Sequence, residues 1–259
     1  MMATTAWPAE DIWEQVYPLL PDFTVEVLPE IDSSNSELMR RVRAGQHEPT
    51  LLVAERQTAG RGRMGRVWQS HCGDSLTFSL SLPLSPRDWS GLSLAVGLSL
   101  AESLHPEIGL KWPNDLWWQD RKLGGILVEA ASMGEHSHVV VGVGLNIRPR
   151  LAEGLNTPPA ALTELRPELT AARCLAEVAL PLVQMLKSFE SEGFAPLQTR
   201  FAARDVLKGR RVHTSDGMVG SAAGVSAVGA FQLQTEDGLQ HIHSAEVSVR
   251  PFPFEDNSR

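Results

Sequence analysis

Three arginines and three glycines lie within seven consecutive residues, Gly60-Arg61-Gly62-Arg63-Met64-Gly65-Arg66. Glycine lets backbone N–H groups come close to an anion, and the guanidinium group offers forked donors to a carboxylate or a phosphate. The segment lacks the Gly-Lys-Ser/Thr ending of a Walker loop and the third spaced glycine of a dinucleotide-binding fingerprint. By composition alone, an anion-binding loop, a solvated flexible loop and an RNA-binding Arg-Gly segment all remain open.

Two further segments combine a lysine with residues that suit a ligand. The chain has four lysines, and two of them occur in Lys111-Trp112-Pro113-Asn114-Asp115 and Lys122-Leu123-Gly124-Gly125-Ile126-Leu127. Asn-Asp after a proline is typical of a turn, whereas paired glycines at the start of a strand allow a ligand to approach the backbone. Gly144-Leu145-Asn146 ends an apolar stretch with one polar side chain, which an ordinary strand end would also explain.

Residues for metal binding or nucleophilic catalysis do not form a convincing set. His241 and His243 share one face of a predicted strand, but no acidic or cysteine ligand accompanies them, so we expect no metal site there. Cys72 and Cys174 are far apart in the sequence, and we expect both to be buried, unpaired residues of a reducing compartment. The sequence contains no nucleophile elbow and no Ser-His-Asp order.

Composition and charge narrow the class of protein. The 259 residues are 42% hydrophobic and 21% charged, as in an ordinary globular protein, and the net charge of −8 disfavours a protein that binds nucleic-acid phosphate. No Lys or Arg precedes Arg40, so we expect neither a secretory signal nor a transit peptide. The longest uncharged run, 217–235, is too polar for a bilayer. We therefore expect a cytoplasmic protein without a membrane segment.

The elements that would position these segments form an α+β pattern. Apolar spacing predicts an opening helix from Pro8 to Leu20 with Trp13 in its apolar stripe, and Ser34 and Glu37 have capping-box spacing at the start of a second helix that Gly45 ends. Period-2 alternation predicts that Leu76–Leu82 is a half-buried strand. The remaining predicted elements are strands Val25–Leu28, Leu51–Ala54, Ile108–Lys111, Leu116–Trp118, Gly124–Glu129 and Val139–Ile147, and a buried helix Ser90–Leu104.

The last hundred residues change in character. A proline-rich loop, Asn156–Pro167, precedes a helix that Thr170 caps and that runs to about Glu192, with Pro181 expected to kink or interrupt it, and a short helix runs through Phe201. From about Asp205, short strands separated by Asp-Gly turns predict a small β-barrel. These strands are Arg211–His213, Met218–Ala223, Ala230–Thr235 and Glu246–Val249. We thus predict two domains, residues 1–204 and 205–259.

Taken together, the segments resemble the biotin protein ligases. Their order and spacing match that family from about Val25 to the C-terminus, and the arginine-glycine loop combined with the two lysine segments is highly specific. Ser33-Ser34-Asn35 stands where Ser-Thr-Asn is the familiar form. The resemblance implies a mixed β-sheet catalytic domain of the biotin/lipoate ligase type with flanking helices, followed by a small Src-homology-3-like β-barrel.

The resemblance also implies the chemistry. The family joins biotin to ATP, releases pyrophosphate, and passes biotin from biotinyl-5′-adenylate to a lysine of a biotin carboxyl carrier protein. A carboxylate must meet a phosphate in the first step, and two unit charges about 4 Å apart repel by roughly 4 kcal/mol at an effective dielectric constant of about 20. Lys122 is the expected fixed cation, and Arg61 and Arg63 are expected to fold over the ligand and exclude water.

The residues that the resemblance assigns to the site form three overlapping groups. The catalytic residues are Lys122, Arg61 and Arg63. The biotin-binding residues are Ser33, Ser34, Asn35, Gln57, Gly60, Arg61, Gly62, Arg63, Lys122 and Gly124. The ATP-binding residues are Arg63, Arg66, Trp68, Lys111, Asn114, Asp115, Lys122 and Asn146. Mg²⁺ is expected to arrive with ATP, near Asp115, rather than to occupy a side-chain motif of its own.

Two other classes of function remain as alternatives. A lipoate or octanoate ligase or transferase would share the catalytic fold, and a binding module without chemistry would use the arginine loop on nucleic acid. About thirty residues precede Ser33, too few for a winged helix, so we expect an enzyme without specific DNA binding. A homodimer is left open.

Overall fold

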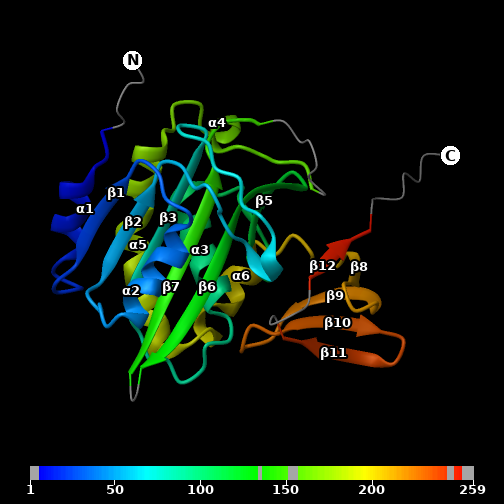
Figure 1. The fold of residues 1–259 in the computed structure, drawn as a ribbon. Helices are drawn as coiled ribbons and strands as arrows, with labels where there is room; N and C mark the ends of the chain where they lie inside the picture. Colours follow the sequence, from blue (N-terminus) through cyan, green and yellow to red (C-terminus); the bar gives the residue numbers. More distant parts are fainter. Residues whose placement is uncertain (1–5, 134–135, 151–156, 244–247, 253–259) are drawn as a thin grey trace.

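A computed structural model describes residues 6–133, 136–150, 157–243 and 248–252. Its larger body is built on a seven-stranded sheet with the order β1-β2-β3-β7-β6-β5-β4 (Figure 1). β1 and β2 are parallel and every other neighbouring pair is antiparallel, so the sheet is mixed, as the family resemblance implies. The strands are β1 Thr24–Leu28, β2 Thr50–Ala54, β3 Ser75–Pro83, β4 Gly109–Lys111, β5 Asp115–Trp118, β6 Arg121–Met133 and β7 His136–Asn146.

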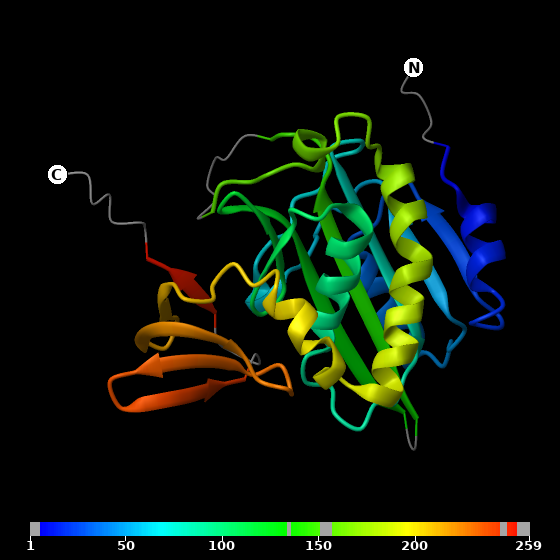
Figure 2. The same cartoon turned by 180° about the vertical axis from the view of Figure 1, so that it is seen from behind.

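Helices cover both faces of this sheet. α2, Ser34–Arg43, lies on one face, and α3, Leu92–Leu104, lies with α5, Ala171–Glu192, on the other (Figure 2). The prediction that β3 is half-buried is therefore wrong. Phe78 points into the large core under α3 and α5, and Ser79, on the other side of the strand, is equally buried beneath α2, where it hydrogen-bonds to Ser34 and Asn35. The polar side of β3 thus faces a helix terminus rather than water.

Three helix predictions need correction. α5 is continuous through Pro181, because its long apolar face packs on α3 and the sheet and offsets the hydrogen bond that proline removes. α1, Ala9–Val16, ends four residues before Leu20, and Trp13 is 41% exposed instead of facing the core. The helix α4, Leu162–Leu165, lies within the predicted loop. The short helices η2 Ala195–Leu197 and α6 Gln198–Ala202 precede the second sheet.

The start of α2 differs from its predicted cap. Ser33, not Ser34, is the N-cap, and its hydroxyl accepts from the backbone N–H of Ser36. Glu37 does not close a capping box but forms ion pairs with two arginines one turn further on. Ser34 is thereby left for other contacts. Of the two cysteines, Cys174 is buried as expected, whereas Cys72 is exposed.

A second, antiparallel sheet follows, with the order β11-β10-β9-β8-β12. It lies beside the β4–β5 edge of the first sheet (Figure 1). Its strand order is open in the described residues and compatible with the expected Src-homology-3-like barrel. The predicted strand Glu246–Val249 begins outside the described residues, and β12 starts only at Val249. The strands are β8 Arg211–Thr214, β9 Val219–Val225, β10 Phe231–Thr235, β11 Gly238–Ile242 and β12 Val249–Pro251.

One aromatic contact fastens the two sheets together. Trp112, which follows β4, is fully buried, and its indole N–H donates to the carbonyl of Gly229 at 3.1 Å. Its ring also packs on Phe231, with 5.3 Å between the ring centroids. Because only Pro113 separates Trp112 from Asn114 and Asp115, this contact brings the second sheet next to the polar turn. Within the described residues, no helix is long and apolar enough to cross a membrane.

Candidate active site

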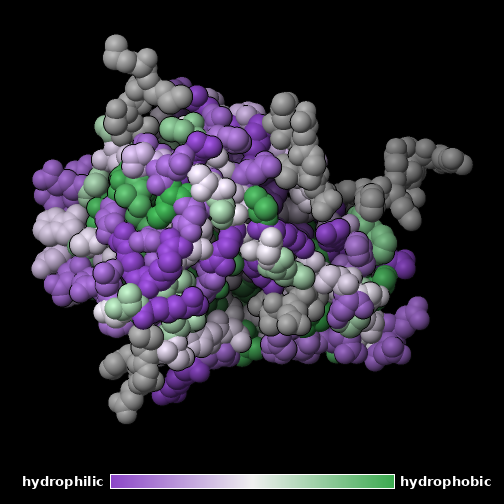
Figure 3. All heavy atoms as spheres, in the orientation of Figure 1, coloured by the Kyte–Doolittle hydropathy of each residue, from purple (hydrophilic) through white to green (hydrophobic). Residues whose placement is uncertain are grey.

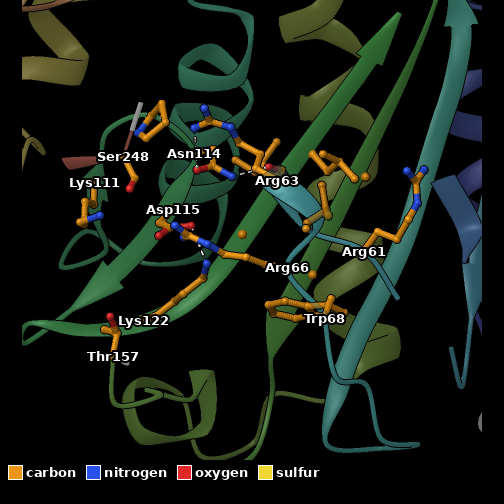
Figure 4. Close-up of a pocket in the computed structure, with 18 of the residues that line it drawn as sticks. Arg61, Arg63, Arg66, Trp68, Lys111, Asn114, Asp115, Lys122, Thr157 and Ser248 are labelled. Carbon is orange, nitrogen blue, oxygen red and sulfur yellow. Dashed lines mark hydrogen bonds and ion pairs between the residues drawn. The ribbon is translucent and has the colours of Figure 1, made fainter. Parts of the chain in front are cut away.

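A pocket of about 790 Å³ opens on the α2 side of the first sheet, between the arginine loop and the second sheet (Figure 4). Figure 3 shows that hydrophilic side chains predominate on this face, while a hydrophobic patch lies away from it, over β1 and β2. The pocket brings together most of the residues that the sequence singled out. They are Ser33, Ser34, Asn35, Gln57, Arg61, Gly62, Arg63, Arg66, Trp68, Lys111, Asn114, Asp115 and Lys122.

One end of the pocket is a network of hydroxyl and amide groups. The backbone N–H and the hydroxyl of Ser34 both lie within hydrogen-bond distance of Oε1 of Gln57, at 2.7 and 3.0 Å. The Ser34 hydroxyl also lies 2.7 Å from that of Ser79, which donates to Oδ1 of Asn35 at 2.6 Å. The amide nitrogen of Asn35 donates to the carbonyl of Leu127 and to the Glu129 carboxylate. The side chains at this end are therefore held in fixed orientations.

Two glycines of β7 form the floor. A Cβ atom at Gly142 would lie 2.3 Å from Oδ1 of Asn35, and one at Gly144 would lie 2.4 Å from the ring of Trp68. Residues i and i+2 of a strand face the same side. Asn35 and the Trp68 ring therefore lie side by side, packed directly on the backbone of Gly142 and Gly144. Any side chain larger than hydrogen at either position would push one of them into the pocket.

The arginine loop is a tight turn that its own backbone hydrogen bonds hold closed. Gly62 N–H donates to the carbonyl of Arg66 at 2.7 Å, and Trp68 N–H donates to that of Gly60 at 2.9 Å. The reversal is made by Met64 and Gly65, with φ angles of 55° and 70°.

Beyond this turn, the two predicted catalytic arginines diverge. Arg61 forms an ion pair with Glu129, and Arg63 reaches towards Asn114, to whose Oδ1 it donates at 3.4 Å. Figure 4 shows Arg61 on the opposite side of the pocket from Asp115 and Lys122. Burial lowers the pKa of Arg63, but a guanidinium group remains charged in proteins.

A second group of charges lies at the other end, where β5 and β6 begin. The Lys122 ammonium donates to Oδ1 of Asp115 at 2.6 Å. The Lys122 backbone is held as well, because its N–H donates to the carbonyl of Pro158 and its carbonyl accepts from Ala160. A Cβ atom at Gly125 would lie 3.3 Å from the Lys122 nitrogen, so glycine leaves room for the ammonium.

Lys111 is the most buried cation of the pocket, with 8% of its surface exposed. Its nitrogen lies 5.1 Å from the centroid of the Trp117 ring. Burial lowers the pKa of Lys111 to about 8, although the nearby Asp115 carboxylate opposes the shift. This lysine therefore loses its charge at a lower pH than an exposed lysine does.

Three residues assigned from the sequence do not line the pocket. Gly60 and Gly124 lie just behind it, each where a Cβ atom would collide with a backbone carbonyl. Asn146 is 1% exposed, and its amide nitrogen donates to the carbonyls of Lys122 and Ala160. In the structure, Asn146 supports the backbone of Lys122 from behind.

The sequence missed several lining or supporting residues. Ser79 and Glu129 belong to the polar network. In the sequence they look like the polar residues of any strand in which polar and apolar side chains alternate. Arg150 covers the Trp68 ring, with 5.5 Å between its guanidinium carbon and the ring centroid. Arg210, which directly precedes β8, and Arg250 of β12 also line the pocket. Their position depends on how the two sheets dock, which no local pattern reveals.

Comparisons with known proteins agree with this arrangement. Residues 28–146 match the "Biotin/lipoate A/B protein ligase family", and residues 209–250 match the "Biotin protein ligase C terminal domain". The chain is 34% identical over 249 residues to the bifunctional ligase/repressor BirA of Escherichia coli, covering 92% of this chain and 77% of BirA. It is 32% identical over 204 residues to the biotin–[acetyl-CoA-carboxylase] ligase of Mycobacterium tuberculosis, covering 73% of each.

A solved structure gives the same result in three dimensions. The biotin protein ligase of Aquifex aeolicus in complex with biotin and ATP superposes with a TM-score of 0.75 at 30% identity, and the match covers 88% of this chain and 99% of that one. Sequence identity, fold and the two matched segments all indicate the same family. This chain belongs to the biotin protein ligases.

Proposed function

We propose that this chain condenses biotin with ATP to biotinyl-5′-adenylate and transfers biotin to a lysine of a carrier protein. The observation that carries the proposal is the order of groups along one pocket. The uncharged hydroxyl and amide side chains of Ser34, Asn35 and Gln57 lie at one end, and a fixed lysine ammonium lies at the other. An indole ring packs on the backbone of Gly144 beside the uncharged side chains. A ligand that is neutral and polar at its head and anionic at its tail suits this order.

We assign the polar end to the ureido ring of biotin. Ser34, Asn35 and Gln57 offer both donors and acceptors, as a cyclic urea requires. Ser33 caps α2 and holds the turn that carries them. Because their orientations are fixed before the ligand arrives, little conformational entropy is lost on binding.

We assign the opposite end to the meeting of the two anions. In the first half-reaction a biotin carboxylate oxygen attacks the α-phosphorus of ATP, a P–O bond breaks, and pyrophosphate leaves with the electron pair. Lys122 lies where a cation relieves the repulsion and stabilises the charge on phosphorus, and Asp115 keeps its ammonium in place. Lys111, Arg63 and Arg66 offer further positive charge to the triphosphate.

The nucleotide side of the pocket fits ATP with Mg²⁺. Trp68, supported by Gly144, offers a face to adenine, and Arg150 now covers part of that ring. Asp115 and Asp120 are the two acidic side chains among the described lining residues. So few carboxylates suit an Mg²⁺ ion that is carried mainly by phosphate oxygens. When bound, Mg²⁺ neutralises phosphate charge, and we propose Asp115 as its nearest protein group.

In the second half-reaction the amine of the carrier lysine attacks the acyl carbon and AMP leaves. The arginine loop keeps water from the mixed anhydride until then. A carboxyl carrier protein as acceptor and a cytoplasmic location are part of the same proposal.

Binding of radiolabelled biotin, measured with and without ATP, tests this function. We expect retention of label to rise sharply with Mg-ATP, together with pyrophosphate release and labelling of a carrier domain. Adenylation of lipoate but not biotin would instead indicate a lipoate ligase. ATP-independent binding to nucleic acid, with no adenylate, would indicate the binding module.

A further inference from the structure

Glu129 lies where the arginine loop meets the sheet. It is a half-buried residue of β6, and its carboxylate accepts from the guanidinium of Arg61 at 2.9 and 3.2 Å. The same carboxylate accepts from the amide nitrogen of Asn35 at 2.9 Å. One side chain thus holds both a loop arginine and a residue of the polar end of the pocket.

These contacts extend an unbroken chain of hydrogen bonds. Starting at Gln57, it passes through the two serine hydroxyls and Asn35 to Glu129, and ends at Arg61. Each link is 3.2 Å or shorter. A change in the polar end is therefore connected by direct bonds to the position of the loop.

Two other side-chain bonds between residues 60–68 and the body of the first sheet are long. Arg63 reaches Asn114 and the Trp68 indole reaches Thr77 at 3.4 Å each, against 2.9 Å between Arg61 and Glu129. The backbone hydrogen bonds of the loop at Gly62, Arg66 and Trp68 join the loop to itself and fix its shape, not its position over the pocket. The side chains of Met64 and Val67 are 56% and 77% exposed and contribute little packing. Arg61 is turned away from Lys122 and Asp115 (Figure 4), so its partner in this structure is Glu129 rather than the site of phosphate chemistry.

We propose that Glu129 is a positioning residue that anchors the arginine loop through Arg61. The pair seats the loop beside the polar end of the pocket, and retention of the activated intermediate depends on it. The seating of the loop stands on the contacts alone, whereas the effect on the intermediate rests on the proposed function.

The first test uses the protein without ligands. Amide hydrogen exchange of residues 60–68 is compared in the parent, Glu129→Gln, Glu129→Ala and Arg61→Ala. Exposed ion pairs are weak, so we expect exchange about three- to fivefold faster in the alanine variants and an intermediate rate in Glu129→Gln, which keeps an acceptor oxygen. The double variant Arg61→Ala/Glu129→Ala should be no faster than either single one.

A matched control separates anchoring from general loss of an ion pair. Glu102 and Arg200 form a pair of similar exposure between α3 and α6, away from the pocket. We expect Glu102→Gln to leave exchange of residues 60–68 unchanged. Parent-like exchange in Glu129→Ala, or an equal effect of Glu102→Gln, would overturn the proposal.

The second test measures the intermediate. Biotinyl-adenylate formed in a single turnover should dissociate about three- to fivefold faster from Glu129→Ala, while its rate of formation at saturating biotin and ATP changes much less. A general folding defect would lower both. If the parent forms no adenylate from biotin, the proposed function fails, and the exchange experiment alone decides whether Glu129 anchors the loop.

Discussion

The ammonium of Lys122 on β6 and the carboxylate of Asp115 on the neighbouring strand β5 lie 2.6 Å apart, with side-chain exposures of 31% and 15%. Both residues are fixed by the strands that carry them, so the cation has little freedom to move. A pre-oriented charge stabilises a transition state more than a mobile one, because it does not have to reorganise during the reaction.

We therefore predict that Lys122→Met lowers the single-turnover rate of adenylate formation by roughly a hundredfold or more. Lys187→Met is the control, because Lys187 forms an exposed pair with Glu190 on α5, outside the pocket. Quenched-flow measurement of pyrophosphate release reports the rate, and thermal unfolding checks both variants. A Lys122→Met rate equal to that of the parent would remove Lys122 from the chemistry.

 

Arg63 gives a different prediction. Its half-buried side chain lines the pocket and donates to Oδ1 of Asn114 at 3.4 Å. We predict that Arg63→Ala loses biotinyl-adenylate to solvent at least about tenfold faster than the parent, because a charge that holds the anhydride and excludes water is gone. The released adenylate should label lysines of an added bystander protein, which a streptavidin blot measures.

Arg56→Ala is the control for this variant. Arg56 is an exposed arginine near the same loop, and it pairs with Glu30 outside the pocket. We expect it to retain the adenylate as long as the parent does. Equal retention by Arg63→Ala and the parent would contradict the shielding role.

The sequence could predict the site largely because its groups are local in the chain. Gly60 to Arg66, Lys111 to Asp115 and Lys122 to Gly125 each carry their chemistry within a few residues, and strands on either side bring them to one pocket. The cap of α2 was misplaced by one residue, because Ser33 and Ser34 suit an N-cap equally well by type. Only the contacts of Ser34 with Gln57 and Ser79 show which serine is free to cap.

The parts that the sequence could not predict depend on long-range contacts. Ser79 and Glu129 become part of the site because α2 and the loop pack over their strands. Arg250 reaches the pocket because Trp112 and Gly229 join the two sheets, more than a hundred residues apart in sequence. Continuity of α5 through Pro181 likewise depends on packing that local propensity does not contain.

Lys111 leads to a prediction about pH. Its pKa is lowered from 10.5 to about 8, mainly by burial. Between these two values the unfolded chain holds a proton that the folded chain lacks, so this group makes the free energy of unfolding rise with pH in that window. The affinity for ATP should instead fall as the pH rises through about 8, because Lys111 then loses the charge that attracts phosphate.

Titration calorimetry with ATP at a series of pH values from about 7 to 9 tests this prediction. We expect the affinity of the parent to fall across the range, and that of Lys111→Met to be weaker at the start and to change less. A parent affinity that does not vary with pH would show that Lys111 does not contribute its charge to ATP binding.

The two floor glycines of β7 give the last prediction, because they lie under different halves of the ligand. Gly142→Ala places a methyl group against Asn35, which three hydrogen bonds hold in place, and Gly144→Ala places one against the ring of Trp68. We expect the first variant to raise KM for biotin by roughly tenfold and the second to raise KM for ATP by a similar factor, about 1.4 kcal/mol each.

Each variant is the control for the other, since both add one methyl group to the same strand. Loss of folded protein would lower kcat without separating the two KM values, so the ratio of KM for biotin to KM for ATP is the informative measurement. It should rise in Gly142→Ala and fall in Gly144→Ala. Equal changes in both KM values in both variants would contradict the assignment of biotin to the Asn35 end and of adenine to Trp68.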